Sequence, residues 1–372
     1  MTIGVLKEPP GETRVSLLPE AVAGLTKKGA KVLVEQGAGF GASATDTDYE
    51  KAGATVARAE DLVQQAEIIL CIHQPVAGLS IPASKILIGV YQPLYHPVIM
   101  QEWAQNGLTV FSLDMLPRTT RAQSMDVLSS QANISGYKAV LLAANLYPRY
   151  FPMFMTAAGS IAPAKLLILG AGVAGLQAIA TARRLGAVVE VFDTRPAVKE
   201  EVMSLGARFV EVEGAADASK AGGYAVEQTE EYKQKQQQRI AESLAKADIV
   251  ITTAQIPGKK APILITEEMV RSMRNGSIII DIAAATGGNT PFTKNNETVD
   301  VNGVKIVGNS NLPATMPSDA SKLYGKNITN FLALITSKEG AVYLNWEDDL
   351  VKGSCITHSG EVVHERVKQP VN

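Results

Sequence analysis

The stretch Lys165-Leu-Leu-Ile-Leu-Gly170-Ala-Gly172-Val-Ala-Gly175 decides the fold. Its apolar residues before Gly170 indicate a buried strand, and the residues that follow Gly175 have the pattern of a helix. A G-x-G-x-x-G run between a strand and a helix is typical of a dinucleotide-binding turn. In such a turn the three glycines permit a tight bend, the approach of a pyrophosphate, and close packing of helix on strand. The N-terminus of the helix offers free N–H groups to the phosphates.

An acidic residue at the end of the next predicted strand suits the other end of a dinucleotide. Asp193 lies 18 residues past Gly175, the right distance for accepting hydrogen bonds from the adenosine ribose. A carboxylate there repels a 2′-phosphate and favours NAD(H) over NADP(H), although the guanidinium of Arg195 could offset the repulsion. The alternative is a glycine-rich turn without a ligand. The residues expected to bind NAD(H) here are Gly170, Ala171, Gly172, Val173, Ala174, Gly175, Asp193, Thr194 and Arg195.

Alternating strand and helix patterns run along most of the chain and predict an α/β fold. Five strand-like runs precede residue 115, and six more begin at Lys165 and end at Val307. We therefore expect two tandem doubly wound, Rossmann-like domains. Two long helical patterns, Arg121–Leu146 and Ser318–Thr336, would link them, so that the second domain is an insertion in the first. The expected domains are 1–125 with 320–372, and 126–319.

Composition excludes several classes of function. The net charge of −2 gives no general attraction to nucleic acid or to anionic lipid. The apolar runs are shorter than a bilayer span, and the first residues lack a secretory signal, so we expect a cytoplasmic protein without membrane insertion. Two distant cysteines, Cys71 and Cys355, and four histidines show no metal-ligand spacing. A metal site is not expected.

Several blocks resemble a known superfamily over nearly the whole chain. They are Gly4-Val-Leu-Lys-Glu8, Glu12-Thr-Arg14-Val15 with Pro19, Gln36-Gly-Ala-Gly39, Ala254-Gln-Ile-Pro-Gly-Lys259, and Asp281-Ile-Ala with Gly287-Gly288-Asn289. These blocks are similar to those of alanine dehydrogenases and of the NAD(H)-binding component of proton-translocating nicotinamide nucleotide transhydrogenases. A slightly shortened loop around Pro9-Pro10-Gly11 is the departure from the pattern.

The two branches of this superfamily differ in the groups that move protons. Oxidation of an amino acid needs a positioned acid or base. Alanine dehydrogenases have a lysine, a histidine and an aspartate at places that here hold His73, Gln92 and Ala285. Amino-acid chemistry is therefore disfavoured. Arg14 remains, and would either hold a substrate carboxylate or form a structural ion pair.

The segment Pro117–Ser129 resembles the nicotinamide pocket of the transhydrogenase component. The resemblance implies that Arg118, with Thr119 and Thr120, contacts the cofactor and that Asp126 holds the guanidinium of Arg118. It also implies that Ser129 binds the carboxamide and that Gln123 reaches the second nucleotide. The three-residue spacing of Gln123, Asp126 and Ser129 would place them on one helix face. A helix cap at Thr120 and a solvated polar face are the alternatives. These alternatives stay open.

The resemblance also implies a mobile loop and a homodimer. The loop around Gly222–Ala225 would close over NAD(H), with Gly223 as hinge and Tyr224 as closing residue, although a surface insertion is the alternative. Gln236 would lie nearby, and Gln255, after a strand, would face the adenosine half. The homodimer would form through Tyr150–Pro163.

The implied complex has two further subunits, one that binds NADP(H) and one that spans the membrane. The present chain would be peripheral on the inner face of the cytoplasmic membrane. Direct hydride transfer between NAD(H) and NADP(H), coupled to proton translocation, is the expected function. An amino-acid dehydrogenase that uses His73 as base and a non-catalytic NAD-sensing protein are the competing hypotheses.

Overall fold

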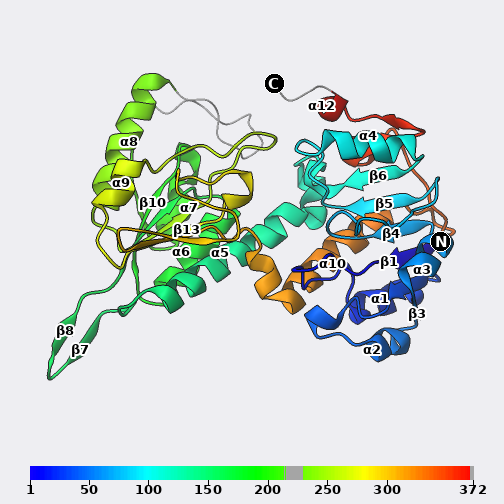
Figure 1. Ribbon diagram of the computed structural model, residues 1–372, viewed down its shortest axis with the longest axis horizontal. Helices are drawn as coiled ribbons and strands as arrows, with labels where there is room; N and C mark the ends of the chain where they lie inside the picture. Colours follow the sequence, from blue (N-terminus) through cyan, green and yellow to red (C-terminus); the bar gives the residue numbers. More distant parts are fainter. Residues whose placement is uncertain (213, 215–228, 369–372) are drawn as a thin grey trace. The chain divides into compact units, whose positions relative to one another are not determined.

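A computed structural model describes residues 1–212, 214 and 229–368 of the chain (Figure 1). The chain divides into two compact units. Unit 1 consists of Met1–Gln131 and Pro313–Asn372, and unit 2 of Ala132–Leu312. Unit 1 is thus assembled from both ends of the sequence, whereas unit 2 is one continuous stretch. The observed junctions lie at 131/132 and 312/313, beside the expected 125/126 and 319/320.

Unit 1 is built on an eight-stranded sheet with the order β17-β16-β6-β5-β4-β1-β2-β3. Its strands are β1 (Thr2–Val5), β2 (Lys31–Glu35), β3 (Thr55–Ala57), β4 (Ile68–Leu70), β5 (Ile86–Gly89), β6 (Thr109–Ser112), β16 (Cys355–His358) and β17 (Glu361–Val362). The first six strands are parallel, and β16 and β17 extend the sheet as antiparallel strands beside β6. The six parallel strands have the order 3-2-1-4-5-6, so the direction of winding reverses between β1 and β4.

Helices cover both faces of this sheet because its strands are buried on both sides. In β4, Ile68 and Leu70 join one core and Ile69 the other, as the two-residue period of a strand requires. The first core includes residues of α1 (Pro19–Thr26), α2 (Asp46–Lys51), α10 (Pro317–Leu334) and α11 (Asp349–Ser354). The second includes residues of α3 (Ala59–Gln65), α4 (Pro97–Gln105) and α12 (Glu365–Lys368).

Unit 2 contains a seven-stranded sheet with the order β11-β10-β9-β12-β13-β15-β14. Its strands are β9 (Lys165–Leu169), β10 (Val188–Phe192), β11 (Arg208–Phe209), β12 (Ile249–Thr252), β13 (Ile278–Asp281), β14 (Thr298–Val301) and β15 (Val304–Val307). All pairs are parallel except β14 with β15. The six parallel strands again follow the order 3-2-1-4-5-6, with the switch between β9 and β12. The predicted doubly wound α/β class is confirmed.

The helices of unit 2 form one layer on each face of its sheet. One core contains residues of α5 (Val127–Leu146), α6 (Val173–Arg184) and α7 (Lys199–Ser204). The opposite core contains residues of α8 (Glu230–Leu244) and α9 (Glu267–Ser272). Short 3-10 turns are η1 (Phe40–Ala42), η2 (Leu113–Met115), η3 (Thr120–Met125), η4 (Pro196–Val198), η5 (Ala284–Thr286) and η6 (Leu312–Thr315).

A small hairpin forms a sheet of its own. Its strands β7 (Phe154–Thr156) and β8 (Gly159–Ile161) pair only with each other among the strands described (Figure 1). Nearly all of its residues are exposed, including the large apolar side chains of Phe154 and Met155. A two-stranded hairpin without a covered apolar face has little stability of its own in water.

The predicted long helix Arg121–Leu146 is broken, which corrects one expectation. Residues Thr120–Met125 form the 3-10 turn η3, and Asp126 is extended, with φ −75° and ψ 90°. The Asp126 carboxylate then accepts a hydrogen bond from the backbone N–H of Ser129 at 2.9 Å, as a residue before a helix does. Gln123, Asp126 and Ser129 therefore do not share one continuous helix face.

Candidate functional site

The glycine-rich turn of unit 2 begins directly at the end of β9. Gly170 has a φ of +106°, a conformation that side chains disfavour. A Cβ atom on Gly175 would lie 1.9 Å from the carbonyl oxygen of Gly170, so only glycine lets α6 approach the strand this closely. A Cβ atom on Gly172, in contrast, would meet no heavy atom within 4 Å. The turn is closed toward the sheet and open in front of Gly172.

The first turn of α6 presents backbone N–H groups at this open side. Gly172 is the residue before the helix, and no side chain caps it. The first N–H groups of a helix have no partner within it, and they carry the positive end of its dipole. A glycine facing open space beside such a terminus fits a pyrophosphate. The turn thus fits the phosphate region of a dinucleotide.

Asp193 lies at the end of β10, beside this turn. Its Oδ2 atom accepts a hydrogen bond from the N–H of Ala171 at 2.7 Å, which ties the carboxylate to the glycine turn. Arg195 binds the same carboxylate through Nε at 2.9 Å and through a terminal nitrogen at 2.7 Å. The hydrogen bond to Asp193 raises the pKa of Arg195. The expected acid is in place, and it is paired with the neighbouring arginine.

Two buried polar residues hold the loop that follows β12. The amide of Asn289 donates to the carbonyls of Ala254 at 2.9 Å and of Pro262 at 2.8 Å, and its oxygen accepts from the N–H of Ala254 at 3.1 Å. Asp281 accepts from the N–H of Asn289 at 2.6 Å and from the hydroxyl of Thr293 at 2.6 Å. Both Asn289 and Asp281 are completely buried.

No individual role was predicted for Asp281 and Asn289, although both lie in blocks on which the resemblance rests. Polar side chains at a strand end, next to a Gly-Gly pair, were the available signal. A buried polar group is costly unless it is hydrogen-bonded. These two residues satisfy that condition by fixing the loop at the carboxyl ends of β12 and β13, on the edge of the sheet where the glycine turn lies.

The remaining predicted residues of unit 2 have different surroundings. Gln236 is buried on α8. Gln255 is exposed, and its amide donates to the carbonyl of Ile282 at 3.2 Å. Gly223 and Tyr224 lie outside the described residues.

In unit 1 the structure brings together three of the four residues predicted for the nicotinamide pocket. A terminal nitrogen of Arg118 lies 3.3 Å from the hydroxyl of Ser129 and 3.5 Å from the carboxylate of Asp126. The Ser129 hydroxyl donates to Asp126 at 2.6 Å. Gln123 is exposed, and its side chain makes no hydrogen bond to any residue in the described ranges. Thr119 and Thr120 are exposed beside Arg118.

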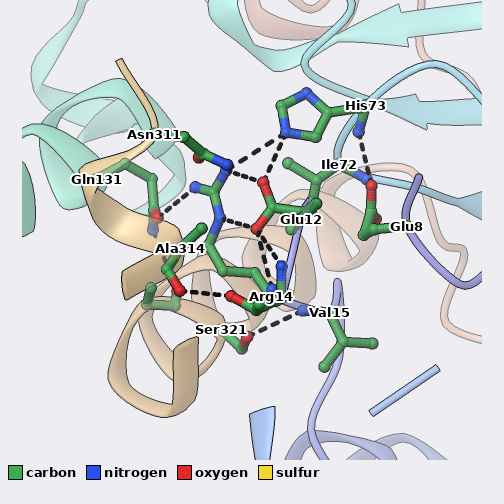
Figure 2. Close-up of polar contacts among 12 residues, drawn as sticks. Glu8, Glu12, Arg14, Val15, Ile72, His73, Gln131, Asn311, Ala314 and Ser321 are labelled. Carbon is green, nitrogen blue, oxygen red and sulfur yellow. Dashed lines mark hydrogen bonds and ion pairs between the residues drawn. The ribbon is translucent and has the colours of Figure 1, made fainter. Parts of the chain in front are cut away.

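The switch point of unit 1 is filled by a cluster of charged side chains, drawn in Figure 2. Arg14 donates to both oxygens of Glu12, at 2.8 and 2.6 Å, and to the side-chain oxygen of Gln131 at 2.8 Å. The imidazole Nε2 of His73 lies 2.8 Å from Glu12. Burial acts to raise the pKa of Glu12, but the hydrogen bonds from Arg14 and His73 outweigh it and lower this pKa strongly. Arg14 is thus a partner in a buried ion pair.

A second carboxylate of this cluster is held between the ends of β1 and β4. Glu8 accepts hydrogen bonds from the backbone N–H of Ile72 at 2.6 Å and of His73 at 3.0 Å. Its burial raises the pKa of Glu8 to about 7, against the lowering effect of these hydrogen bonds. From the sequence, Glu8 was only the last residue of a family block, because a carboxylate between Lys7 and Pro9 carries no sign of its burial.

Neither a metal centre nor a membrane span is found in the described residues. Within residues 1–212, 214 and 229–368, no three His, Cys, Asp or Glu side chains are grouped in a way that could hold a metal ion. Across the same stretches of the chain, no helix is both long enough and apolar enough to cross a membrane.

Two doubly wound sheets, one of them with an open glycine turn and a paired acid, define a two-domain α/β protein of the dinucleotide-binding class. Family models described as alanine dehydrogenase/PNT, N-terminal domain and C-terminal domain, match residues 4–135 and 139–365. The chain is 45% identical to the first of the polypeptides that form NAD(P) transhydrogenase subunit alpha in Rhodospirillum rubrum, over 98% of each chain.

Solved structures give the same result. A transhydrogenase crystal structure from Sinorhizobium meliloti superimposes with a TM-score of 0.89 at 46% identity, covering 98% of this chain and 100% of that one. An L-alanine dehydrogenase matches with a TM-score of 0.82 at 25% identity, covering 100% and 99%. The chain belongs to the alanine dehydrogenase/transhydrogenase family.

Proposed function

We propose that this chain is the NAD(H)-binding subunit of a proton-translocating nicotinamide nucleotide transhydrogenase. The observation that carries the proposal is the turn at Gly170–Gly175, which is open where a pyrophosphate needs space and has Asp193 beside it. The relatives at 41–45% identity that are named as transhydrogenase alpha subunits support this branch of the family. The contacts of Arg14 support it too, because its guanidinium is bound to Glu12 and Gln131.

The chain's own residues would divide the work of binding. The turn Gly170–Gly175 and the start of α6 would hold the pyrophosphate, Asp193 the adenosine ribose, and Gln255 the adenosine half. Arg118 would bind the carboxamide or phosphate side, oriented by Asp126, with Ser129 as a second donor to the carboxamide. Gln123, whose exposed side chain has no hydrogen bond within the described residues, would be available to the second nucleotide.

The proposed reaction places few demands on proton-handling groups. A bound nicotinamide supplies a carbon that gives or accepts a hydride, and no proton moves at the reacting carbons. The chain would therefore need to orient the ring and exclude water, not to provide a general base. Ionisation of Asp126 would serve the orientation of Arg118.

The driving force would come from partner subunits. A proton crossing a potential of ~150 mV supplies roughly 3.5 kcal/mol. That free energy shifts an equilibrium ratio by a few hundred-fold. We place NADP(H) on a separate subunit and proton conduction in a membrane-spanning one. The present chain would be peripheral to them, on the inner face of the cytoplasmic membrane.

A reconstitution assay tests the proposal. The purified chain is mixed with NADH and an oxidised NADP-type acceptor, with and without an NADP(H)-binding partner subunit. We expect hydride transfer only in the presence of the partner. Turnover of alanine, or of pyruvate with ammonia, would support an amino-acid dehydrogenase instead. NADH binding without either reaction would leave a sensing protein.

Substitution of Gln123 by asparagine sharpens this assay. If Gln123 reaches the second nucleotide, Gln123→Asn lowers the rate of hydride transfer at least about tenfold and changes NADH affinity by less than about twofold. Thr120→Ser, at an exposed neighbour, is the control. An equal loss of rate and affinity would make Gln123 an ordinary cofactor contact.

We also propose that the hairpin β7–β8 forms a homodimer interface. Met153 and Met155 are 65% and 73% exposed, and apolar surface of this kind is favoured in contacts between chains. The double substitution Met153→Glu and Met155→Glu should shift the mass measured by light scattering from dimer to monomer. A dimer that persists unchanged would exclude the hairpin as the interface.

A further inference from the structure

The carboxylate that is expected to bind the adenosine ribose has all of its acceptor positions in use. Oδ1 of Asp193 accepts from the backbone N–H of Arg195 at 2.8 Å and from its Nε at 2.9 Å. Oδ2 accepts from Ala171 at 2.7 Å and from a terminal nitrogen of Arg195 at 2.7 Å. An ionised carboxylate has about four lone-pair positions. Two of the four bonds come from the guanidinium of Arg195.

A nucleotide that donates ribose hydroxyls to Asp193 must therefore take positions that the Arg195 side chain holds. The backbone donors at Ala171 and Arg195 can stay in place, but the bonds of the guanidinium have to open. Arg195 is two residues from Asp193, so its charge remains close to the ribose after the exchange. The side chains of Asp193 and Arg195 are 5% and 18% exposed, which limits screening by solvent.

The charge of this pair bears directly on nucleotide selectivity. A lone carboxylate at the ribose repels a 2′-phosphate, and a nearby arginine accommodates it. Here the carboxylate and the arginine form one bidentate pair, whose geometry suits phosphate as well as carboxylate. We propose that Arg195 sets selectivity at the adenosine end, by weakening the discrimination of this site against nucleotides that carry a 2′-phosphate. This inference rests on the proposed function, since it assumes that the adenosine half binds beside Asp193.

The test uses only the adenosine half of each nucleotide, so that the nicotinamide end has no influence. The dissociation constants of 5′-ADP and of 2′,5′-ADP are measured by calorimetry on the full chain and on Arg195→Gln. We expect the ratio of the second constant to the first to rise about tenfold in the variant, equivalent to about 1.4 kcal/mol. High salt should reduce the difference between the two proteins, because the effect is electrostatic.

Two further variants separate charge from structure. Arg195→Lys keeps the charge but lacks the planar fork, and should give a ratio between those of the unsubstituted protein and Arg195→Gln. Arg208→Gln removes an exposed cation of unit 2 that pairs with Glu190, and should leave the ratio within about twofold of the original. Thermal unfolding of each variant shows that the ratios compare folded proteins.

The outcomes distinguish this inference from the proposed function. Binding of 5′-ADP with a ratio that does not respond to Arg195→Gln would overturn the role of Arg195 alone. An equal change in Arg208→Gln would also overturn it, because a general loss of positive charge would then explain the effect. If neither nucleotide bound to the unsubstituted chain, the proposed NAD(H) site itself would be wrong.

Discussion

The two units have parallel sheets with the same strand order but opposite arrangements at the point where that order reverses. Between β9 and β12 of unit 2, the strand end continues as Gly170-Ala-Gly172, and a Cβ atom on Gly172 would meet nothing within 4 Å. Between β1 and β4 of unit 1, the strand ends lead into Glu8, Glu12 and His73, which bind Arg14 and backbone N–H groups (Figure 2). One switch point offers backbone donors to a ligand, and the other uses its polar groups within the protein.

This difference teaches that a doubly wound sheet provides a place for a ligand and that the loops decide whether the place is used. The fold alone does not assign a function to either unit. In unit 2, glycines remove side chains from the turn and leave N–H groups available. In unit 1, a buried arginine and two glutamates contribute to stability. Three substitutions test this contrast, from the largest expected effect to the smallest.

Removal of the Arg14 charge should destabilise unit 1 most. Arg14→Met leaves the Glu12 carboxylate, 3% exposed, buried without its cation, and breaking such a pair costs about 3–5 kcal/mol. Urea unfolding followed by tryptophan fluorescence measures this loss, because both tryptophans, Trp103 and Trp346, lie in unit 1.

The control for this variant is Arg58→Met, which breaks an exposed pair with Asp61. Because both partners of that pair are solvated, the change should cost less than about 1 kcal/mol. NADH affinity should be retained by the protein with Arg14→Met under folding conditions. A loss of affinity without a loss of stability would mean that the cluster of unit 1 is itself a ligand site.

Glu8 should make the stability of unit 1 depend on pH near neutrality. Burial raises the pKa of Glu8 from 4.5 to about 7, so the folded protein holds this proton more tightly than the unfolded chain does. The resulting stabilisation is complete below pH 4.5 and is lost as the pH rises to about 7. At about 1.4 kcal/mol for each unit of pKa, the loss amounts to up to about 3 kcal/mol.

Glu8→Gln tests this pH dependence. Glutamine resembles the protonated acid and does not titrate, so the free energy of unfolding should fall less steeply between about pH 5 and about pH 7.5 than in the unsubstituted protein. The same tryptophan signal reports it, and Glu20→Gln, at an exposed carboxylate, is the matched control. Equal slopes with and without Glu8 would show that its carboxyl group does not titrate in this range.

A side chain on Gly172 should remove nucleotide binding and preserve the fold. Gly172 has φ −75° and ψ −171°, which valine adopts readily, and its Cβ atom would enter the open space of the turn. We expect Gly172→Val to weaken NADH binding at least ~100-fold, about 2.7 kcal/mol, with little change in the thermal midpoint. NADH fluorescence measures the affinity.

Gly175→Ala provides the contrasting case. Its Cβ atom would lie 1.9 Å from the carbonyl oxygen of Gly170, so this variant should lower the thermal midpoint as well. If Gly172→Val bound NADH as tightly as the unsubstituted chain, the pyrophosphate would not lie in front of Gly172. The comparison between the two switch points would then fail.

Much of the fold follows from local patterns in the sequence. The apolar run before Gly170 forms β9 at the predicted residues, Lys165–Leu169, because a strand buried on both faces needs a continuous apolar run. The short strand β3 and the hairpin strands β7 and β8 were not predicted. Their residues are partly or fully exposed, so they lack the apolar pattern on which such predictions depend.

The candidate site was less accessible from the sequence, because its geometry depends on contacts between distant residues. The break at Asp126 follows from one hydrogen bond to Ser129, which competes with a helical pattern that continues on both sides. The ion pair of Arg14 could be proposed only as one of two alternatives, since its partner Gln131 lies 117 residues away. Burial of Asp281 and Asn289 becomes visible only when the strands are assembled.

The discontinuity of unit 1 has a consequence for the birth of the protein on the ribosome. Strand β16 pairs with β6, yet Cys355 follows Ser112 by 243 residues. At roughly 5–20 residues per second, synthesis of that stretch takes about 12–50 s. During this time the open edge of β6 is a template for pairing with other chains. The continuous unit 2 can fold first, while the N-terminal segment waits for its last strands.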